Sequence, residues 1–238
     1  MVNPSNISFS KTIKQAHQYL VTENNPEKAS NYLEEVISES QNYDRGLLHW
    51  LALTYLEDAK YDRAKETYLK IHEFYQAGYC ELLKGDLSEA KSLWADCIKS
   101  EARAWARAFE SMLEGFIAYE PTFLGLRNHL EVDLGYLLRA KQIKFSENII
   151  SLIEDLSQIN LECYKFAGRA LMNNGFEHQA VNFLLMGQKI LPNDPEIYYH
   201  LGQYSQSVGA LSEAKSMYKH CLLLSPSYTP AKDRLREF

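Results

Sequence analysis

A sequence pattern recurs after about 34 residues in the C-terminal part of the chain, and a fixed period of this length constrains the whole fold. In residues 191–226 an aromatic residue is followed by a Leu-Gly pair, a turn glycine, an alanine, a second aromatic residue, a small residue and a proline. These positions are Tyr198, Leu201, Gly202, Gly209, Ala214, Tyr218, Cys221 and Pro226. The preceding copy holds Tyr164, Ala167, Gly168, Gly175, Ala180, Leu184, Gly187 and Pro192. Two adjacent copies in register indicate a true internal repeat.

Looser copies of the pattern precede these two. The alanine of the second helix is found at Ala29, Ala64 and Ala90. The last of these steps is short, so we expect the hairpin over residues 74–98 to follow its predecessor with almost no linker. Between residues 100 and 160 the pattern degrades, but apolar residues keep a helical spacing, which predicts two degenerate hairpins. After Pro226 we expect one short helix with Thr229 as its N-cap.

In the order and spacing of these residues the chain resembles the tetratricopeptide repeat family. The resemblance is close over about 10–98 and 160–226 and weak over 100–160. It implies an all-α fold, a right-handed superhelical solenoid of about six helix-turn-helix hairpins. We expect a single solenoid domain over residues 1–238, with a C-terminal capping helix at 227–238.

The small residues of the pattern have packing roles. We expect Gly168 and Gly202 to let paired helices approach closely, because glycine places no side chain between the two backbones. Gly85, Gly175 and Gly209 lie between the helices of a hairpin, where a left-handed backbone ends a helix. The widely spaced cysteines are expected to be small buried core residues. These are Cys80, Cys97, Cys163 and Cys221.

Composition narrows the choice of partner. The formal net charge is -6, with acidic and basic residues mixed along the chain, so no basic field gathers nucleic acid or anionic lipid. The N-terminal sequence lacks a basic segment followed by an apolar run, and no long apolar run predicts membrane insertion. We therefore expect a cytoplasmic protein, and the resemblance to the repeat family implies a protein or peptide partner.

The sequence holds no motif that predicts catalysis. We find no glycine-rich phosphate loop, no HExxH pair, no GxSxG elbow and no cysteine cluster, and the seven histidines share no spacing. We therefore predict that the chain is not an enzyme and has no catalytic residues, no metal site and no cofactor.

A concave partner-binding face follows from the resemblance, because in this family the first helix of each hairpin lines the inner surface. Residues spaced i, i+4 and i+7 on those helices are then candidates. By repeat position the candidates are His49, Leu53, Tyr75, Tyr79, Lys165, Arg169, Tyr199 and Gln203, together with Leu56, Leu82, Met172 and Gln206. Such a groove suits a peptide with an apolar stretch and a carboxylate near Lys165 and Arg169. In the alternative interpretation, Tyr75, Tyr79 and Leu82 only pack against the irregular middle segment.

Two further functional interpretations were weighed. Some family members bind acidic chaperone tails through a clamp of Lys, Asn and Arg, but Gln18, Trp50 and Gln76 do not reproduce it beside Lys14. The second is self-association. Exposed apolar residues of the 100–160 region, such as Trp105, Phe109 and Phe116, would pair two solenoids into a homodimer.

Overall fold

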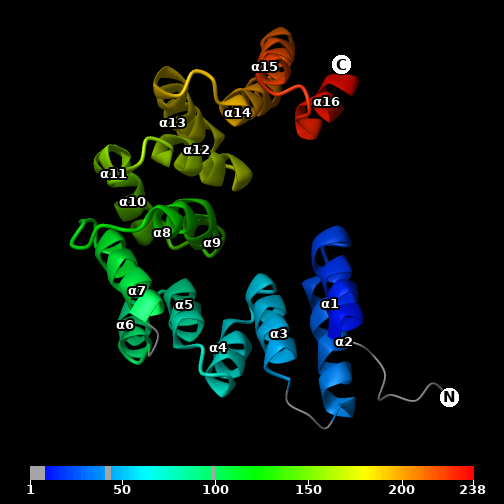
Figure 1. The fold of residues 1–238 in the computed structure, drawn as a ribbon, viewed down its shortest axis with the longest axis vertical. Helices are drawn as coiled ribbons and strands as arrows, with labels where there is room; N and C mark the ends of the chain where they lie inside the picture. The colour runs from blue at the N-terminus through cyan, green and yellow to red at the C-terminus, as the bar shows by residue number, and fades with distance from the viewer. Residues whose placement is uncertain (1–8, 41–43, 98–99) are drawn as a thin grey trace, which may run out of the picture. The chain divides into compact units, whose positions relative to one another are not determined.

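The computed structural model describes residues 9–40, 44–97 and 100–238, and over these ranges it holds helices and no strand (Figure 1). Neighbouring helices pack against one another in adjacent pairs. The chain divides into two compact units, Met1–Ala106 and Arg107–Phe238, and each is described by itself. The all-α fold class predicted from the sequence is confirmed for the described residues.

The first unit is built from short helices that follow one another with brief turns. They are α1 (Phe9–His17), the π-helical segment η2 (Gln18–Thr22), α2 (Pro26–Glu39), α3 (Arg45–Glu57), α4 (Tyr61–Lys70), α5 (Phe74–Lys84) and α6 (Leu87–Ala95). Helix α7 (Ser100–Leu113) crosses the boundary between the units. Consecutive helices from α2 to α6 pack side by side, and each buries one face against its neighbours.

The second unit contains both the irregular middle and the regular C-terminal repeats. Its helices are α8 (Phe123–Asn128), the π-helical segment η3 (His129–Asp133), α9 (Leu134–Arg139), α10 (Ile143–Ser151), α11 (Ile153–Ile159), α12 (Cys163–Asn173), α13 (Glu177–Ile190), α14 (Pro195–Ser207), α15 (Leu211–Leu224) and α16 (Thr229–Arg236). The pairs α12 with α13 and α14 with α15 coincide with the two copies that are clearest in the sequence (Figure 1).

Small residues bring the paired helices together as the sequence predicts. A Cβ atom placed on Gly202 would lie 2.6 Å from Tyr218 Cε1, and one on Gly168 would lie 2.8 Å from Leu184 Cγ. The repeat alanines are all fully buried. These are Ala29, Ala64, Ala90, Ala180 and Ala214. The expected left-handed turns are also present, with positive φ at Gly85, Gly175 and Gly209.

The segment between α7 and α10 differs from the expected pair of hairpins. Residues 114–122 form no helix, because Gly115 ends α7 in a left-handed conformation with φ 86° and Thr122 caps α8 with its hydroxyl. Helices α8, η3 and α9 then follow without a break and turn into α10 through Lys141, at φ 59°. Between residues 100 and 160 the described helices therefore give α7, one hairpin of α8–η3–α9 with α10, and the short helix α11.

A short C-terminal helix is present where the sequence predicts one. Helix α16 has a proline in its first turn and buries Ala231 completely. Its N-cap is Tyr228, so Thr229 is already helical, and the predicted cap was one residue too late. The Thr229 hydroxyl has no N-cap hydrogen bond and instead donates to Ser227 O at 3.4 Å.

Candidate protein-binding surface

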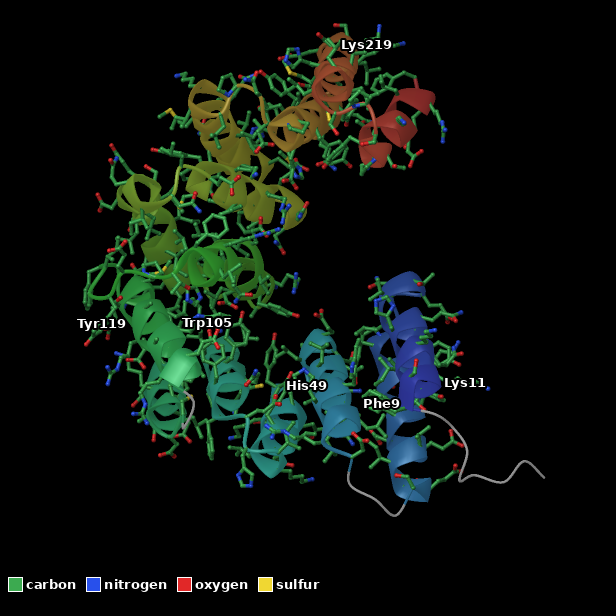
Figure 2. The ribbon with its side chains drawn as sticks, viewed as in Figure 1. Phe9, Lys11, His49, Trp105, Tyr119 and Lys219 are labelled. Carbon is green, nitrogen blue, oxygen red and sulfur yellow. The ribbon has the colours of Figure 1, made fainter. Side chains whose placement is uncertain are left out.

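The candidates in the first unit lie on α3 and α5, and they differ in accessibility. His49 and Leu53 are half-buried on α3. Figure 2 labels His49 in the first unit. Its Nδ1 lies 2.7 Å from Glu73 Oε2, and its ring meets Tyr68 edge-on at 5.9 Å. Both side chains keep part of their surface open to a partner.

Tyr75 and Tyr79 pack within the first unit. The half-buried Tyr75 ring stacks on Trp94 at 5.9 Å with an interplanar angle of 22°, and the indole N–H of Trp94 donates to Tyr75 O at 2.9 Å. Tyr79 is only 6% exposed. Tyr75 therefore packs on α6 and Tyr79 has little surface left for a partner, while packing of either against the irregular middle segment stays a prediction.

Lys165 lies on α12 and is buried, at 8% exposure. Its ammonium donates to Asp194 Oδ2 at 2.7 Å and to Glu162 Oε1 at 3.2 Å. Burial lowers the pKa of Lys165, but the hydrogen bonds and charges of the two carboxylates outweigh it, so the net pKa is raised. The side chain is therefore charged at neutral pH and is already paired inside the protein.

Arg169, one turn further along α12, is paired as well. Its guanidinium contacts Glu131 Oε2 of η3 at 2.6 Å and a carboxylate oxygen of Glu196 on α14. Arg127 Nε also reaches Glu131 Oε2, at 3.0 Å. The two cations that the sequence singled out are thus paired with carboxylates from η3, from the start of α14 and from the N-cap of α12 itself.

Tyr199 and Gln203 lie one turn apart on α14. The Gln203 carbonyl oxygen lies 2.7 Å from His200 Nδ1, and the Gln203 amide donates to the Tyr199 hydroxyl at 3.3 Å. The Tyr199 ring also meets Tyr228 at 5.3 Å, next to the C-terminal helix. Burial lowers the pKa of His200, which is 4% exposed, so the neutral imidazole is favoured.

A hollow of about 370 Å³ opens beside Gln203, and we call it the C-terminal hollow. It is lined by Met172, Asn173, Glu177, Gln203, Gln206, Ser207 and Arg234. The lining comes mainly from α12 and α14, with one residue each from α13 and α16. Three of these side chains, Met172, Gln203 and Gln206, are ones that the sequence assigned to the first-helix face.

The sequence analysis missed other lining residues. Asn173 and Ser207 each end the first helix of their pair, so a search of the last turns of those helices would have found them. Arg234 lies on α16, after the last repeat, which ends at Pro226. The repeat pattern therefore could not assign it to the binding face.

Comparison with protein families identifies part of this region. The tetratricopeptide repeat model matches residues 195–228, which span α14, α15 and the turn before α16. Residues 195–228 therefore form a tetratricopeptide repeat. A comparison with curated proteins finds no match. Tetratricopeptide repeats generally serve as scaffolds for protein–protein interaction, which makes proteins the expected class of partner.

Among the residues that the structure describes, no group of three or more His, Cys, Asp or Glu side chains is placed to hold a metal ion. In the same part of the chain, no helix has both the length and the apolar character needed to span a membrane.

The apolar residues proposed for self-association are only partly exposed. Phe109 is fully buried and stacks on His129 with ring centroids 4.6 Å apart, so the expectation that it is exposed is wrong. Trp105 is half-buried, and Phe116 is 49% exposed. Near Phe116, Tyr119 is also exposed on the segment that joins α7 to α8 (Figure 2).

Proposed function

We propose that this repeat protein is a non-catalytic adaptor of the cytoplasm that binds a segment of another protein along the first helices of its hairpins. The hairpins, about six of them, would form one right-handed superhelical domain whose concave face holds the partner. Neither nucleic acid nor membrane insertion has a part in this proposal, and no cofactor is needed. The C-terminal hollow supports it, because successive first helices contribute to one recess.

The chemistry of the hollow suits an extended peptide. Asn173, Gln203 and Gln206 carry amides, which both donate and accept hydrogen bonds and so match the main chain of a peptide. Met172 supplies a flexible apolar contact for a partner's side chain. Glu177 and Arg234 give the recess one charge of each sign.

The two paired cations have a supporting part in this proposal. A partner carboxylate at Lys165 or Arg169 would have to displace carboxylates that already lie 2.6 to 3.2 Å away. Such an exchange gains little, because the new pair replaces an equivalent one. We therefore propose that the polar recess, with Tyr199 and Gln203 beside it, contributes more to recognition than the two cations do. In the first unit, His49 and Leu53 remain candidates.

The proposal is tested by substitutions at exposed positions that fill the C-terminal hollow with larger side chains. Asn173→Arg and Ser207→Arg together place two long charged side chains in the recess, and both native residues are exposed. The matched control is Asn182→Arg with Ser216→Arg, the same replacements at exposed positions of α13 and α15. Each form is used for affinity capture from native lysate, followed by mass spectrometry, and its circular dichroism is checked.

A partner that the intact chain and the control capture, and that the filled variant loses, supports the proposal. A partner retained by all three forms would place recognition elsewhere on the protein.

Self-association is the second candidate. It is favoured by exposed apolar residues around the α7–α8 segment, namely Phe116, Tyr119, Phe123 and Leu124, with exposures of 49 to 66%. Sedimentation equilibrium of the intact chain and a Phe116→Ser/Phe123→Ser variant tests it. A dimer that the double variant weakens supports this candidate, and a monomer at high concentration excludes it.

A further inference from the structure

A second hollow lies in the first unit, at a place that the repeat pattern did not single out. It has a volume of about 530 Å³. Its lining is Arg45, Leu48, Lys70, Ile71 and His72. Arg45 and Leu48 come from the start of α3, Lys70 is the last residue of α4, and the other two form the turn into α5. We call it the basic hollow.

The cationic side chains of the basic hollow are open, unlike those on α12. The Arg45 side chain is 61% exposed, and its one ion pair, to Glu73 Oε1, is long at 3.7 Å. Lys70 and His72 are exposed, and Lys70 makes no ion pair with any residue that the structure describes. Two acidic residues lie near these cations. The second oxygen of Glu73 is held by His49 at 2.7 Å, and Asp44 Oδ1 accepts from Gly46 N at 2.7 Å at the start of α3. The lining therefore carries an excess of positive charge.

Apolar side chains complete the lining. Leu48 and Ile71 are buried, at 7% and 5% exposure, and their remaining surface borders the hollow. A recess that combines an apolar lining with cations suits a ligand that has an apolar side chain next to negative charge.

The turn that carries the lining is fixed by backbone hydrogen bonds. Ile71 N and Glu73 N both donate to Tyr68 O, at 3.1 and 3.0 Å, and His72 N donates to Leu69 O at 3.1 Å. His72 adopts a left-handed conformation, with φ 58°. The hollow is thus preformed, which lowers the conformational entropy lost on binding.

We propose that the basic hollow binds an acidic peptide segment of a partner protein, with one apolar side chain in the recess and carboxylates at Arg45 and Lys70. Charge complementarity favours this occupant over a purely apolar one. An apolar partner would leave Lys70 without a counter-charge among the described residues and Arg45 with only its long ion pair to Glu73. The proposal adds a second binding site to the adaptor, and it does not depend on the C-terminal hollow.

The experiment measures binding of short fluorescent peptides to the full chain by fluorescence anisotropy. In the probes a single Leu, Ile or Phe is flanked by Asp and Glu, and in the comparison peptides Lys replaces every acidic residue. Arg45→Gln with Lys70→Gln removes the two cations. The control, Lys219→Gln with Lys232→Gln, removes two exposed lysines of α15 and α16 that do not line either hollow.

We expect an acidic probe to bind the intact chain and the control alike, within about twofold, and the Arg45/Lys70 variant about tenfold more weakly. Added salt should weaken binding, because the contacts are exposed. Replacing the apolar residue of the probe with Ala should also weaken it several-fold.

Three results would overturn the proposal: no acidic probe binds, the lysine peptides bind as tightly, or the Arg45/Lys70 variant binds like the control. Displacement of the probe by millimolar inorganic phosphate would assign the hollow to phosphate groups and would also overturn it. The Asn173→Arg/Ser207→Arg variant should bind the acidic probe normally, so failure at one hollow is distinguishable from failure at the other.

Discussion

Gly78 on α5 faces Trp94 on α6 so closely that a Cβ atom at Gly78 would lie 2.6 Å from Trp94 Nε1. The same Cβ would lie 2.8 Å from the carbonyl oxygen of Ala90, which belongs to the backbone and cannot easily move. This contact fixes how closely α5 and α6 approach, and it gives the first prediction.

We expect Gly78→Ala to lower the free energy of unfolding by about 1–2 kcal/mol. Overpacking of this kind costs about 1–3 kcal/mol, and the better helix propensity of alanine offsets up to about 1 kcal/mol. Urea unfolding followed by circular dichroism measures it. The control is Gly187→Ala, whose Cβ would lie 3.3 Å from the mobile end of Ile197. Equal effects at the two glycines would contradict the close-packing explanation.

The hairpin turns predict changes of opposite sign at Ala59 and Gly209. Ala59 adopts φ 54°, a left-handed conformation that costs a residue with a side chain about 1–2 kcal/mol. Ala59→Gly removes this strain, but glycine has more conformational freedom in the unfolded chain, and this offsets part of the gain. The net free energy of unfolding should therefore rise by about 0.5–1 kcal/mol. Gly209→Ala should lower the free energy of unfolding by about 1 kcal/mol, because φ is 80°, a conformation that is unfavourable for alanine. The added Cβ would have no atom within 4 Å, so the backbone conformation alone accounts for this loss. Thermal unfolding of both variants checks the signs, and a loss of stability in Ala59→Gly would show that the turn tolerates its alanine.

Removing the buried cation of α12 should destabilise the second unit. Lys165→Met leaves Asp194 and Glu162 without their shared partner, and the Asp194 side chain is 16% exposed. We expect a loss of roughly 2–3 kcal/mol, less than for a pair fully removed from solvent. Lys189→Met on α13, an exposed lysine, serves as the control in urea unfolding. An unchanged midpoint for Lys165→Met would mean that solvent already screens the pair.

Acid should weaken the protein through His200. Burial holds the pKa of His200 below the ordinary histidine value of about 6.5, so the unfolded chain binds a proton more readily than the folded one. Stability therefore falls as pH drops below 6.5, by at most about 1.4 kcal/mol per pH unit from this group, until the folded pKa is reached. The Gln203 amide, Glu196 and Arg169 act on the same ring with smaller effects. His200→Gln should make the free energy of unfolding less dependent on pH between 6.5 and 5.5 than in the intact chain, and an identical slope would contradict the assignment.

Cysteine labelling can test whether the chain unfolds as one domain. Cys80 in the first unit and Cys163 in the second are buried, and burial raises the pKa of each thiol to about 12. Both should resist alkylation in the native protein and react on unfolding. If the chain is one continuous solenoid, the two should become reactive at the same urea concentration. Separate midpoints would show that the two units unfold independently.

The sequence predicted those parts of the fold that depend on contacts between consecutive helices of the same hairpin. Gly202 and Ala214 lie in adjacent helices of one pair, so the spacing between them is visible in the chain and holds in the structure. Gly78 and Ala90 have that same spacing, but the repeat around them matches the pattern less closely, and the sequence analysis did not assign Gly78 a packing role. Residues 114–122 were harder, because a single glycine and a capping threonine replace a helix there.

The site was less predictable because its electrostatics depend on residues far apart in sequence. Glu131 and Glu196 approach Arg169 from η3 and α14, and no local pattern reveals that they meet. The basic hollow depends in the same way on the end of α4 meeting the start of α3. The sequence shows which residues carry a charge, whereas the structure is needed to show which of these residues form ion pairs.

The contacts of Arg169 have a mechanical consequence. One guanidinium on α12 contacts both η3 and α14, so three elements that are not consecutive in the chain share one set of ion pairs. A pulling force applied at Phe238 that peels helices away in sequence would meet α14 before α12. Separating α14 from α12 must break the charge-assisted contacts of Arg169 as well as apolar contacts. The charge-assisted contacts break over a shorter extension than the apolar contacts do. The unit would then yield in steps, with its hardest step at the junction between the regular repeats and the irregular middle.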